Sequence, residues 1–279
     1  MLGLLERNIT AIEERLVLVA PPQSGVPAVF DKQRIDQRRR RRLMNQLQRL
    51  RGKVYLADGA LRVNDLSFDG RHEIAEDEAA WHLVMLNARG RVSACVWFRE
   101  YENSVSLEQL RVRNCPLRTD PFWGELVTDA VESELTRARR DALRYAEIGG
   151  WAVSKESRCT SEGLLLALGA YSLARLLGGA IGVTTATVRH CSSTILRRLG
   201  GSQLEAHGTS VPSYYDPQYD CTMELLRFDS RRPNPRYAGL VELLKAQLSR
   251  VSVIAAPALV PAHETPALVL TSAEAGAVA

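Results

Sequence analysis

The sequence lacks the usual features of a secreted or membrane-spanning chain. Its five cysteines are odd in number and show no Cys-x-x-Cys or His-paired spacing, so we expect neither a disulfide framework nor a metal site. The longest apolar run, residues 164–177, is interrupted by Arg175 and is shorter than the ~20 residues that a membrane span needs. The N-terminus has an acidic residue at Glu6 and no apolar core typical of a signal peptide. These absences favour a reducing cytoplasm.

A large excess of one charge is also missing. The formal net charge is +4, which does not by itself indicate a nucleic-acid partner. Basic residues are concentrated in one run, Arg38, Arg39, Arg40, Arg41 and Arg42. The simplest interpretation is a solvated helix face, and the alternative is a docking patch for an anionic partner. Because no aromatic side chains interleave the run to stack bases, we do not expect nucleic acid.

The composition, with 46% hydrophobic and 24% charged residues over 279 positions, suits one large globular domain with extensions. We expect an N-terminal helix and linker in residues 1–30, the main domain in 31–230, and a C-terminal helix with an Ala/Pro-rich tail in 231–279. Residues 1–19 have roughly helical spacing. Asp31 could cap a helix that runs to Arg51. The tail from Val251 is expected to pack loosely or be disordered.

Further elements follow from local patterns. Asn87 to Gly90 reads as the turn of a hairpin between two strands in residues 80–101. Two further strands are predicted, at residues 104–112 and 221–228. Two further helices are predicted, at residues 121–145 and 236–250.

The most informative stretch is residues 145–188. An apolar run at residues 148–153 predicts a strand. Ser161 could cap an apolar helix over 164–177, and Gly178 and Gly179 would end it. Residues 181–188 are rich in β-branched side chains and predict a second strand, so the whole forms a right-handed parallel βαβ unit.

The loop before this helix is an expected anion site. Between Arg158 and Gly163 the chain passes from strand to helix, so free backbone N–H groups and the helix dipole point to one place. A diphosphate would fit there. Gly163 would let the backbone approach a ligand closely.

These residues resemble a known superfamily. The loop Arg158-Cys159-Thr160-Ser161-Glu162-Gly163 is similar to the Arg/Gln-x-x-Gly-x-Gly/Ala loop with which GNAT acyltransferases hold the pyrophosphate of coenzyme A. Ser161 stands where a glycine is usual. Some relatives take the acyl group from acyl carrier protein, whose pantetheine carries no adenosine diphosphate.

The resemblance extends along residues 31–229. Residues 190–201 are similar to the Asn-x-x-Ala-x-x-x-Tyr-x-Lys-x-Gly-Phe helix of the superfamily, with His190 at the Asn position and Leu196 at the Tyr position. That tyrosine often protonates the leaving thiolate, a role without an occupant here. Leu50 to Tyr55, Gly70 to Glu73 and residues 82–92 resemble the N-terminal half of acyl-homoserine lactone synthases and long-chain N-acyl amino acid synthases.

The resemblance implies an α/β fold of three layers, a mixed twisted sheet with helices on both faces. Two central strands would splay apart, and acyl-pantetheine would lie in the gap beside Val153, for which core packing is the other interpretation. The implied reaction moves an acyl group, expected to be fatty, from acyl-CoA or acyl carrier protein to the amine of a small molecule such as an amino acid. Acyl carrier proteins are acidic, so the run of arginines would suit that partner.

Candidate catalytic residues each have a plain structural alternative. Glu147, at the head of the first central strand, is the first choice of general base because a partly buried carboxylate can have a raised pKa; it could equally be an exposed charge. Tyr215, or Tyr214, could replace the missing acid, or only cover the core edge. His190 could contact the donor or cap a helix.

Two other functions remain open from the sequence. One is a GNAT-like fold without catalysis, used as a binding or regulatory module. The other is an acetyltransferase with a short acyl donor.

Overall fold

The structure, a computed structural model, describes residues 2–22, 25–158 and 160–257. A ten-stranded mixed sheet forms its centre, in the order β10-β11-β6-β5-β4-β3-β1-β12-β2, with β7 added beside β11. The strands are β1 (Leu16–Val19), β2 (Lys32–Ile35), β3 (Trp81–Leu86), β4 (Val92–Tyr101), β5 (Arg144–Val153), β6 (Ala180–Thr187), β7 (Ser202–Gln203), β10 (Tyr214–Asp216), β11 (Cys221–Asp229) and β12 (Ser252–Ala255). A short hairpin, β8 (Glu205–Ala206) and β9 (Thr209–Ser210), stands apart.

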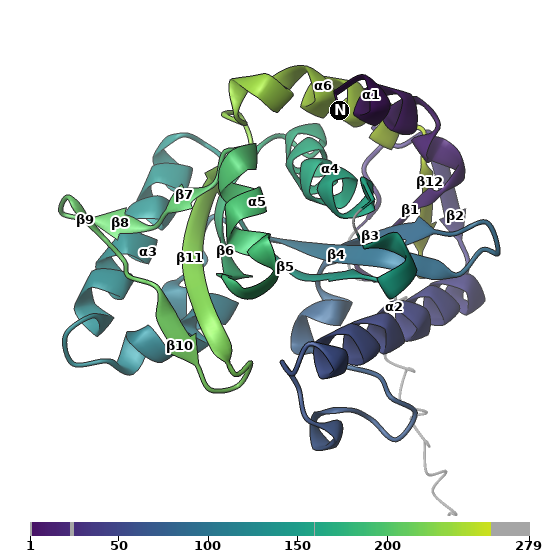
Figure 1. The fold of residues 1–279 in the computed structure, drawn as a ribbon. Coiled ribbons are helices and arrows are strands. Elements are labelled where there is room, and N and C mark those ends of the chain that lie inside the picture. Colours follow the sequence, from purple (N-terminus) through teal and green to yellow (C-terminus); the bar gives the residue numbers. More distant parts are fainter. Residues whose placement is uncertain (1, 23–24, 159, 258–279) are drawn as a thin grey trace, which may run out of the picture.

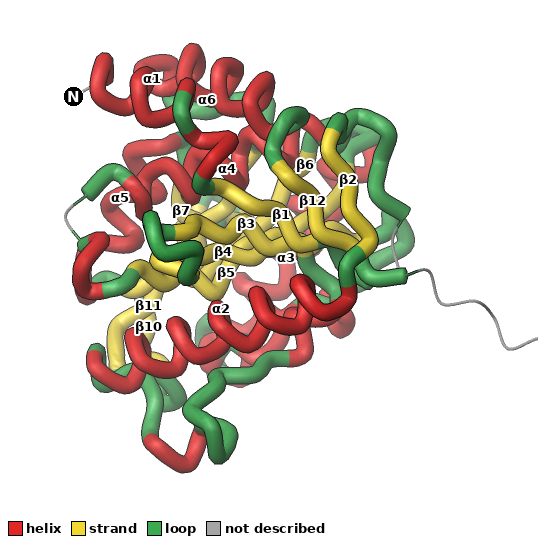
Figure 2. Tube along the Cα trace, turned by 90° about the vertical axis from the view of Figure 1, so that its right-hand side faces the viewer, coloured by secondary structure: helices red, strands yellow, loops and turns green. Residues whose placement is uncertain are grey.

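Helices cover both faces of this sheet (Figure 1). One face carries α1 (Leu2–Thr10), α4 (Glu162–Leu176), α5 (Ser192–Leu199) and α6 (Pro235–Leu248). The other carries α2 (Gln37–Ala57) and α3 (Gly124–Arg140), as the view turned by 90° also shows (Figure 2). Separate apolar clusters form under these layers, the largest beneath α1, α4 and α6. The predicted three-layer α/β fold is therefore confirmed.

The predicted parallel βαβ unit is β5-α4-β6. Its two strands pair in parallel from Arg144 with Ala180 onward. Leucine and alanine cover most of α4, so this helix is buried nearly all round, as its sequence indicates. Ser161 is the N-cap residue, but its hydroxyl accepts a hydrogen bond from Asn8 (2.8 Å) instead of capping a helix N–H group.

Three other predictions of local structure are confirmed, and the strand predicted for residues 104–112 is wrong. The hairpin is β3-β4, with a turn closed by a hydrogen bond from the Gly90 N–H to the Asn87 carbonyl (2.8 Å). The strand predicted for residues 221–228 is β11, antiparallel to β6, and the last predicted helix is α6. Residues 104–112 form no strand. They make two short 3₁₀ turns, Leu107–Gln109 and Arg111–Asn114, because Leu107, Leu110 and Val112 all turn into one core cluster.

The predicted start of the first long helix is wrong. Asp36, and not Asp31, caps α2, since its carboxylate accepts a hydrogen bond from the Arg39 N–H (2.9 Å). Residues 32–35 form β2 instead. Residues 2–19 divide into α1, a 3₁₀ turn at Ile12–Glu14 and β1, so the α-helix ends at Thr10.

The expectation of a loosely packed tail is wrong for residues 252–255. These residues form β12, which lies between β1 and β2 and is parallel to both. Val253 and Ile254 are completely buried. The chain beyond residue 257 lies outside the described part. Both terminal extensions thus contribute strands to the central sheet.

Candidate active site

The site begins where two central strands part. Parallel pairing of β5 with β6 ends at Ile148 and Thr184, although both strands continue. The Thr184 hydroxyl, which donates to the Ile148 carbonyl (2.8 Å), marks the last contact. On the N-terminal side of this pair the two strands lie very close together. A Cβ at Gly182 would lie 1.8 Å from the Ala146 carbonyl oxygen, so only glycine fits. The predicted gap between the central strands is therefore present.

A bulge bends β5 on its other edge at the same height. The register against β4 shifts between Cys95 and Trp97, and Gly150 there has a φ of +63°, a conformation that favours glycine. The Trp97 indole lies directly on Gly149 and Gly150, where a Cβ on either residue would come within 2.4 Å of the ring. A bulge of this kind bends its strand and interrupts the ladder of backbone hydrogen bonds locally.

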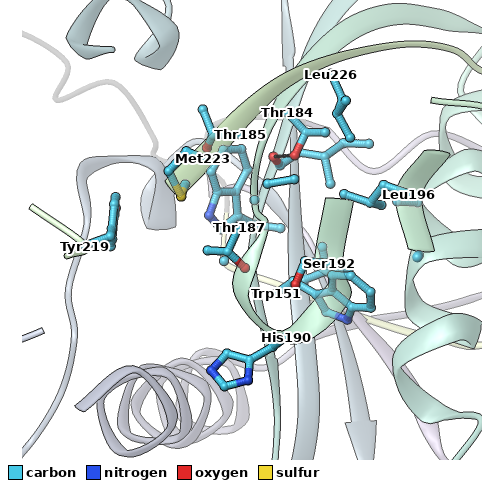
Figure 3. Close-up of a pocket in the computed structure, with 18 of the residues that line it drawn as sticks. Trp151, Thr184, Thr185, Thr187, His190, Ser192, Leu196, Tyr219, Met223 and Leu226 are labelled. Carbon is cyan, nitrogen blue, oxygen red and sulfur yellow. Dashed lines mark hydrogen bonds between the residues drawn. The ribbon is translucent and has the colours of Figure 1, made fainter. Parts of the chain in front are cut away.

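A cavity of about 180 Å³ lies at this gap and reaches both faces of the sheet. Figure 3 shows residues from β5, β6, β11 and α5 around it, with Leu196 and Leu226 on one side and Tyr219 on the other. The cavity is thus bounded by the βαβ unit and by segments distant from it in the sequence.

The wall on the α4 and α5 side is apolar. It consists of aliphatic and aromatic side chains from two helices and one strand: Ala167, Ala170, Tyr171, Leu196, Leu226 and Phe228. The Tyr171 and Phe228 rings pack 5.8 Å apart. The alanines on the side of α4 that faces the cavity have small side chains and so leave room in the cavity. This wall suits a hydrocarbon chain.

The wall on the α2 side is polar and consists largely of charges in pairs. Arg51 is almost fully buried and makes a bidentate pair with Asp77 (2.7 and 2.6 Å). Arg111 binds Glu76 (2.8 Å) with one nitrogen and the Tyr219 hydroxyl (2.8 Å) with another. His72 is also in this wall. Removing one member of such a pair would leave a buried charge without a partner.

Glu147 lies next to this wall but does not line the cavity. Its carboxylate accepts hydrogen bonds from the Tyr101 hydroxyl and from the backbone N–H groups of Arg111 (2.8 Å) and Val112 (2.9 Å). Burial raises the pKa of Glu147, as expected from the sequence. This geometry favours a structural role, since Glu147 holds the turn that carries Arg111. Its role as the base stays a prediction.

The predicted anion loop is at the N-terminus of α4, but its arginine is engaged. Arg158 donates to both carboxylate oxygens of Asp58 (2.9 and 3.1 Å), the residue that ends α2. Thr160 accepts from the Glu162 N–H (3.2 Å). The Glu162 carboxylate turns away to Arg15 and to Ser93 (2.9 Å).

Gly163 completes the loop, and Cys159, the remaining predicted member, lies outside the described residues. A Cβ at Gly163 would sit 3.3 Å from the Trp151 ring and 3.4 Å from Val153. Glycine thus lets α4 pack closely on β5. Val153 is half-buried against the core and does not line the cavity, so its place beside the donor stays a prediction.

The remaining sequence candidates divide between the cavity and the surface. His190 lines the cavity at its mouth, adopts a left-handed conformation, and has Nε2 3.8 Å from the Asp58 carboxylate. Tyr215 is exposed, donates to Asp220, and does not line the cavity. Tyr219, four residues on, lines the cavity instead.

Several residues of the site were missed by the sequence analysis. Asp58, His72, Arg111 and Tyr219 come from loops and helix ends without a local motif. The similarity of Gly70 to Glu73 to the lactone synthases was the one signal near His72. These four side chains lie close together only through tertiary packing, which cannot be predicted from their spacing along the chain.

Neither a protein-family model nor a curated protein sequence matches this chain. Solved structures do match. The CoA-dependent acyl-homoserine lactone synthase MesI aligns over 87% of this chain and 99% of its own, at 15% identity and a TM-score of 0.50. BjaI, a CoA-dependent acyl-homoserine lactone synthase solved with MTA, aligns over 88% and 95%, at 12% identity and a TM-score of 0.51. FeeM, an N-acyl amino acid synthase from uncultured soil microbes, aligns over 71% and 88%, at 13% identity and a TM-score of 0.46.

The matches to MesI and BjaI establish the fold. The chain has the GNAT-like acyltransferase fold in the form found in acyl-homoserine lactone synthases, which confirms the resemblance seen in the sequence. Within the described residues, no helix is long and apolar enough to cross a membrane. No group of three or more His, Cys, Asp or Glu side chains in the same part of the chain is arranged to hold a metal ion.

Proposed function

We propose that this chain is a GNAT-type N-acyltransferase that moves a fatty acyl group from acyl-CoA or acyl carrier protein to the amine of a small molecule such as an amino acid. The observation that carries the proposal is the cavity at the parted ends of β5 and β6. A thioester in the gap could bind the free strand edges, with its acyl chain on the α4 side and the amine on the α2 side. Such positioning supplies much of the rate of an aminolysis.

The apolar wall supports a fatty acyl donor over a short one. Ala167, Ala170 and Leu196 surround the α4 side of the cavity without a charged side chain among them. Each methylene buried there would contribute about 0.8 kcal/mol. The short-chain acetyltransferase is therefore the weaker alternative.

Acyl carrier protein stays a possible donor through the run of arginines. Arg38, Arg41 and Arg42 are exposed, whereas Arg40 is buried against Glu78 (3.0 Å). The run begins α2, and the cavity mouth is at the other end of this 21-residue helix. At 1.5 Å per residue the two ends are about 30 Å apart. A carrier protein on these arginines would need an extended pantetheine arm to reach the mouth.

The test is donor binding followed by turnover. Differential scanning fluorimetry with coenzyme A, acetyl-CoA and palmitoyl-CoA should show the largest thermal shift for palmitoyl-CoA, because its long chain buries the most methylenes. A ligand at a hundred times its Kd adds about 2.7 kcal/mol of stability. Mass spectrometry should then detect N-palmitoyl products from a mixture of the common amino acids. A larger shift with acetyl-CoA would refute the fatty acyl donor.

A variant tests the anion loop directly. Gly163→Asp places a negative group where the donor phosphates should bind, so the shift with palmitoyl-CoA should disappear. Gly163→Ala is the matched control, since it adds the Cβ beside Trp151 without the charge. Equal donor binding by the two variants would exclude the loop as the phosphate site.

A binding or regulatory module without catalysis is the second candidate. Leu196 stands where the superfamily has its acid, and Arg158 is held by Asp58 in place of a phosphate. Palmitoyl-CoA binding without release of thiol in the presence of any amine would favour this candidate.

A further inference from the structure

We infer that His72 is the general base and proton carrier of the acyl transfer. Its imidazole takes a proton from the acceptor nitrogen and returns it to the departing sulfur. The inference rests on the proposed function and goes beyond it by assigning the proton transfer to one side chain.

The backbone of His72 is held firmly in the polar wall. Its N–H donates to the Gln48 carbonyl (3.1 Å), and its carbonyl accepts from the Arg51 guanidinium (2.6 Å). The ring meets Tyr55 edge-on, with 5.6 Å between centroids. Because α2 fixes both backbone groups, the ring has a defined position beside the cavity.

The imidazole, in contrast, has no partner. Neither ring nitrogen makes a hydrogen bond to any described residue, and Nδ1 is fully buried. Arg51 Nε and Trp97 Nε1, in the same wall, are also buried without partners. A buried polar group without a hydrogen bond costs about 1–3 kcal/mol. Three such atoms around one end of a cavity indicate that a bound substrate completes this wall.

The charges around His72 keep it neutral. Burial and then the Arg51 charge on α2 lower the pKa of His72 to about 4, with Arg111 acting in the same direction. Asp77 and Asp65 oppose this shift with their negative charges. The ring is therefore neutral and has a free lone pair at neutral pH.

Most other titratable groups near the cavity are occupied, and His190, at the cavity mouth and outside the polar wall, has its Nε2 3.8 Å from the Asp58 carboxylate. Asp58 binds Arg158, the Tyr219 hydroxyl accepts from Arg111, and the Glu147 carboxylate accepts three hydrogen bonds. Burial raises the pKa of Tyr55, so this phenol stays protonated. His72 is the base in this wall whose nitrogen atoms are left unused by the described residues.

The step balances without another reactant. The amine lone pair forms the C–N bond at the thioester carbonyl, and the nitrogen gives one proton to an imidazole nitrogen. The C–S bond then breaks, and the thiolate takes this proton from the imidazolium. The products are an amide and a free thiol, and His72 is neutral again.

The experiment compares His72→Ala and His72→Gln with the wild-type chain, using palmitoyl-CoA and a mixture of the common amino acids. Both variants should keep the donor-induced thermal shift while kcat falls about a hundredfold, within the usual contribution of general base catalysis. Added imidazole should restore activity to His72→Ala, which leaves space for it, and not to His72→Gln. His207→Ala is the matched control, because His207 is an exposed histidine bound to Asp129 (3.0 Å) outside the cavity.

Each outcome decides the inference. Rescue of His72→Ala by imidazole, with a dependence on the pKa of substituted imidazoles, establishes proton transfer. Wild-type rates in both variants, or loss of activity without rescue, would overturn the assignment of the base to His72 and leave the proposed function standing. Absence of any N-acyl product from the wild-type chain overturns the proposed function and this inference together.

Discussion

The two walls of the cavity differ in the kind of force that holds them together. On the α4 side, Ala167, Leu196 and Phe228 pack in one apolar cluster. On the α2 side, Arg51, Asp77 and their neighbours form a buried network of ion pairs. One gap in a sheet can therefore offer a hydrocarbon-like environment to one reactant and a preorganised polar one to the other.

The difference has a consequence for tolerance to substitution. Apolar walls accept changes that keep volume, whereas a buried ion pair fails when one partner is lost. The predictions below test this contrast, beginning with the largest expected effect.

Asp77→Ala should damage the polar wall most. It leaves the buried Arg51 guanidinium and the Gln48 amide (3.0 Å from the Asp77 carboxylate) without their acceptor. The free energy of unfolding should fall by about 3–5 kcal/mol, measured by urea denaturation. Asp69→Ala, which breaks surface pairs with Arg49 and Arg71, is the control and should change stability little. Equal losses in both variants would contradict the contrast.

Acid should weaken the polar side through its histidines. Burial lowers the pKa of His82 to about 4, and the ring donates to the Asp77 carbonyl (2.9 Å). The unfolded chain takes up this proton near pH 6.5, so stability falls as the pH drops from 6.5 to 4, by up to about 1.4 kcal/mol per pH unit.

His82→Asn should make this fall shallower, measured as the free energy of unfolding at several pH values. Burial raises the pKa of Glu100 to about 7 and opposes the trend, but this carboxyl is present in both proteins. The same pH slope in the variant as in the wild-type chain would show that His82 does not stay neutral in the fold.

Ala170→Leu should shorten the apolar side. The added atoms would occupy the space of a donor chain, so kcat/KM should fall for palmitoyl-CoA relative to shorter donors, by roughly tenfold if two methylenes lose their place. Ala138→Leu makes the same change in the buried face of α3, away from the cavity, and should leave the ratio unaltered. A ratio unchanged by Ala170→Leu would place the acyl chain elsewhere.

Asp58→Asn should have the smallest effect. It releases Arg158, whose partly exposed pair with Asp58 is worth at most about 1 kcal/mol, and donor affinity should rise about two- to fivefold. Isothermal titration with palmitoyl-CoA measures this. Asp129→Asn, on the outer face of α3, controls for a general change of charge. Weaker donor binding would mean that Asp58 positions Arg158 for the phosphates.

The sequence predicted those parts of the fold in which neighbours along the chain decide the structure. The elements β5, α4 and β6 followed from a short apolar run, a longer apolar run that ends at two glycines, and a β-branched run. β2 and β12 were missed because four residues in a strand carry little pattern of their own. Lys32, Gln33 and Arg34 are exposed polar residues that form a strand only because β12 offers an edge.

The site was predicted less completely for a related reason. The gap and the loop after Arg158 belong to one continuous βαβ unit, and both were expected. Asp58, His72 and Tyr219 come from three other segments, and they line one cavity only because α2 packs against the sheet. Glu147 was correctly placed on the first central strand, but its hydrogen-bond partners, from a turn near Arg111, were not visible in sequence.

The place of β12 bears on how the protein is made. Because β12 alone joins β2 to β1, the sheet cannot close before residue 255 has left the ribosome. In the nascent chain, the edges of β1 and β2 that later pair with β12 stay without a partner while all intervening segments are translated. Contacts of such long sequence separation slow folding, and an open strand edge invites aggregation meanwhile. Chaperone dependence during synthesis, relieved once the last strand inserts, is the expected physiological cost of this topology.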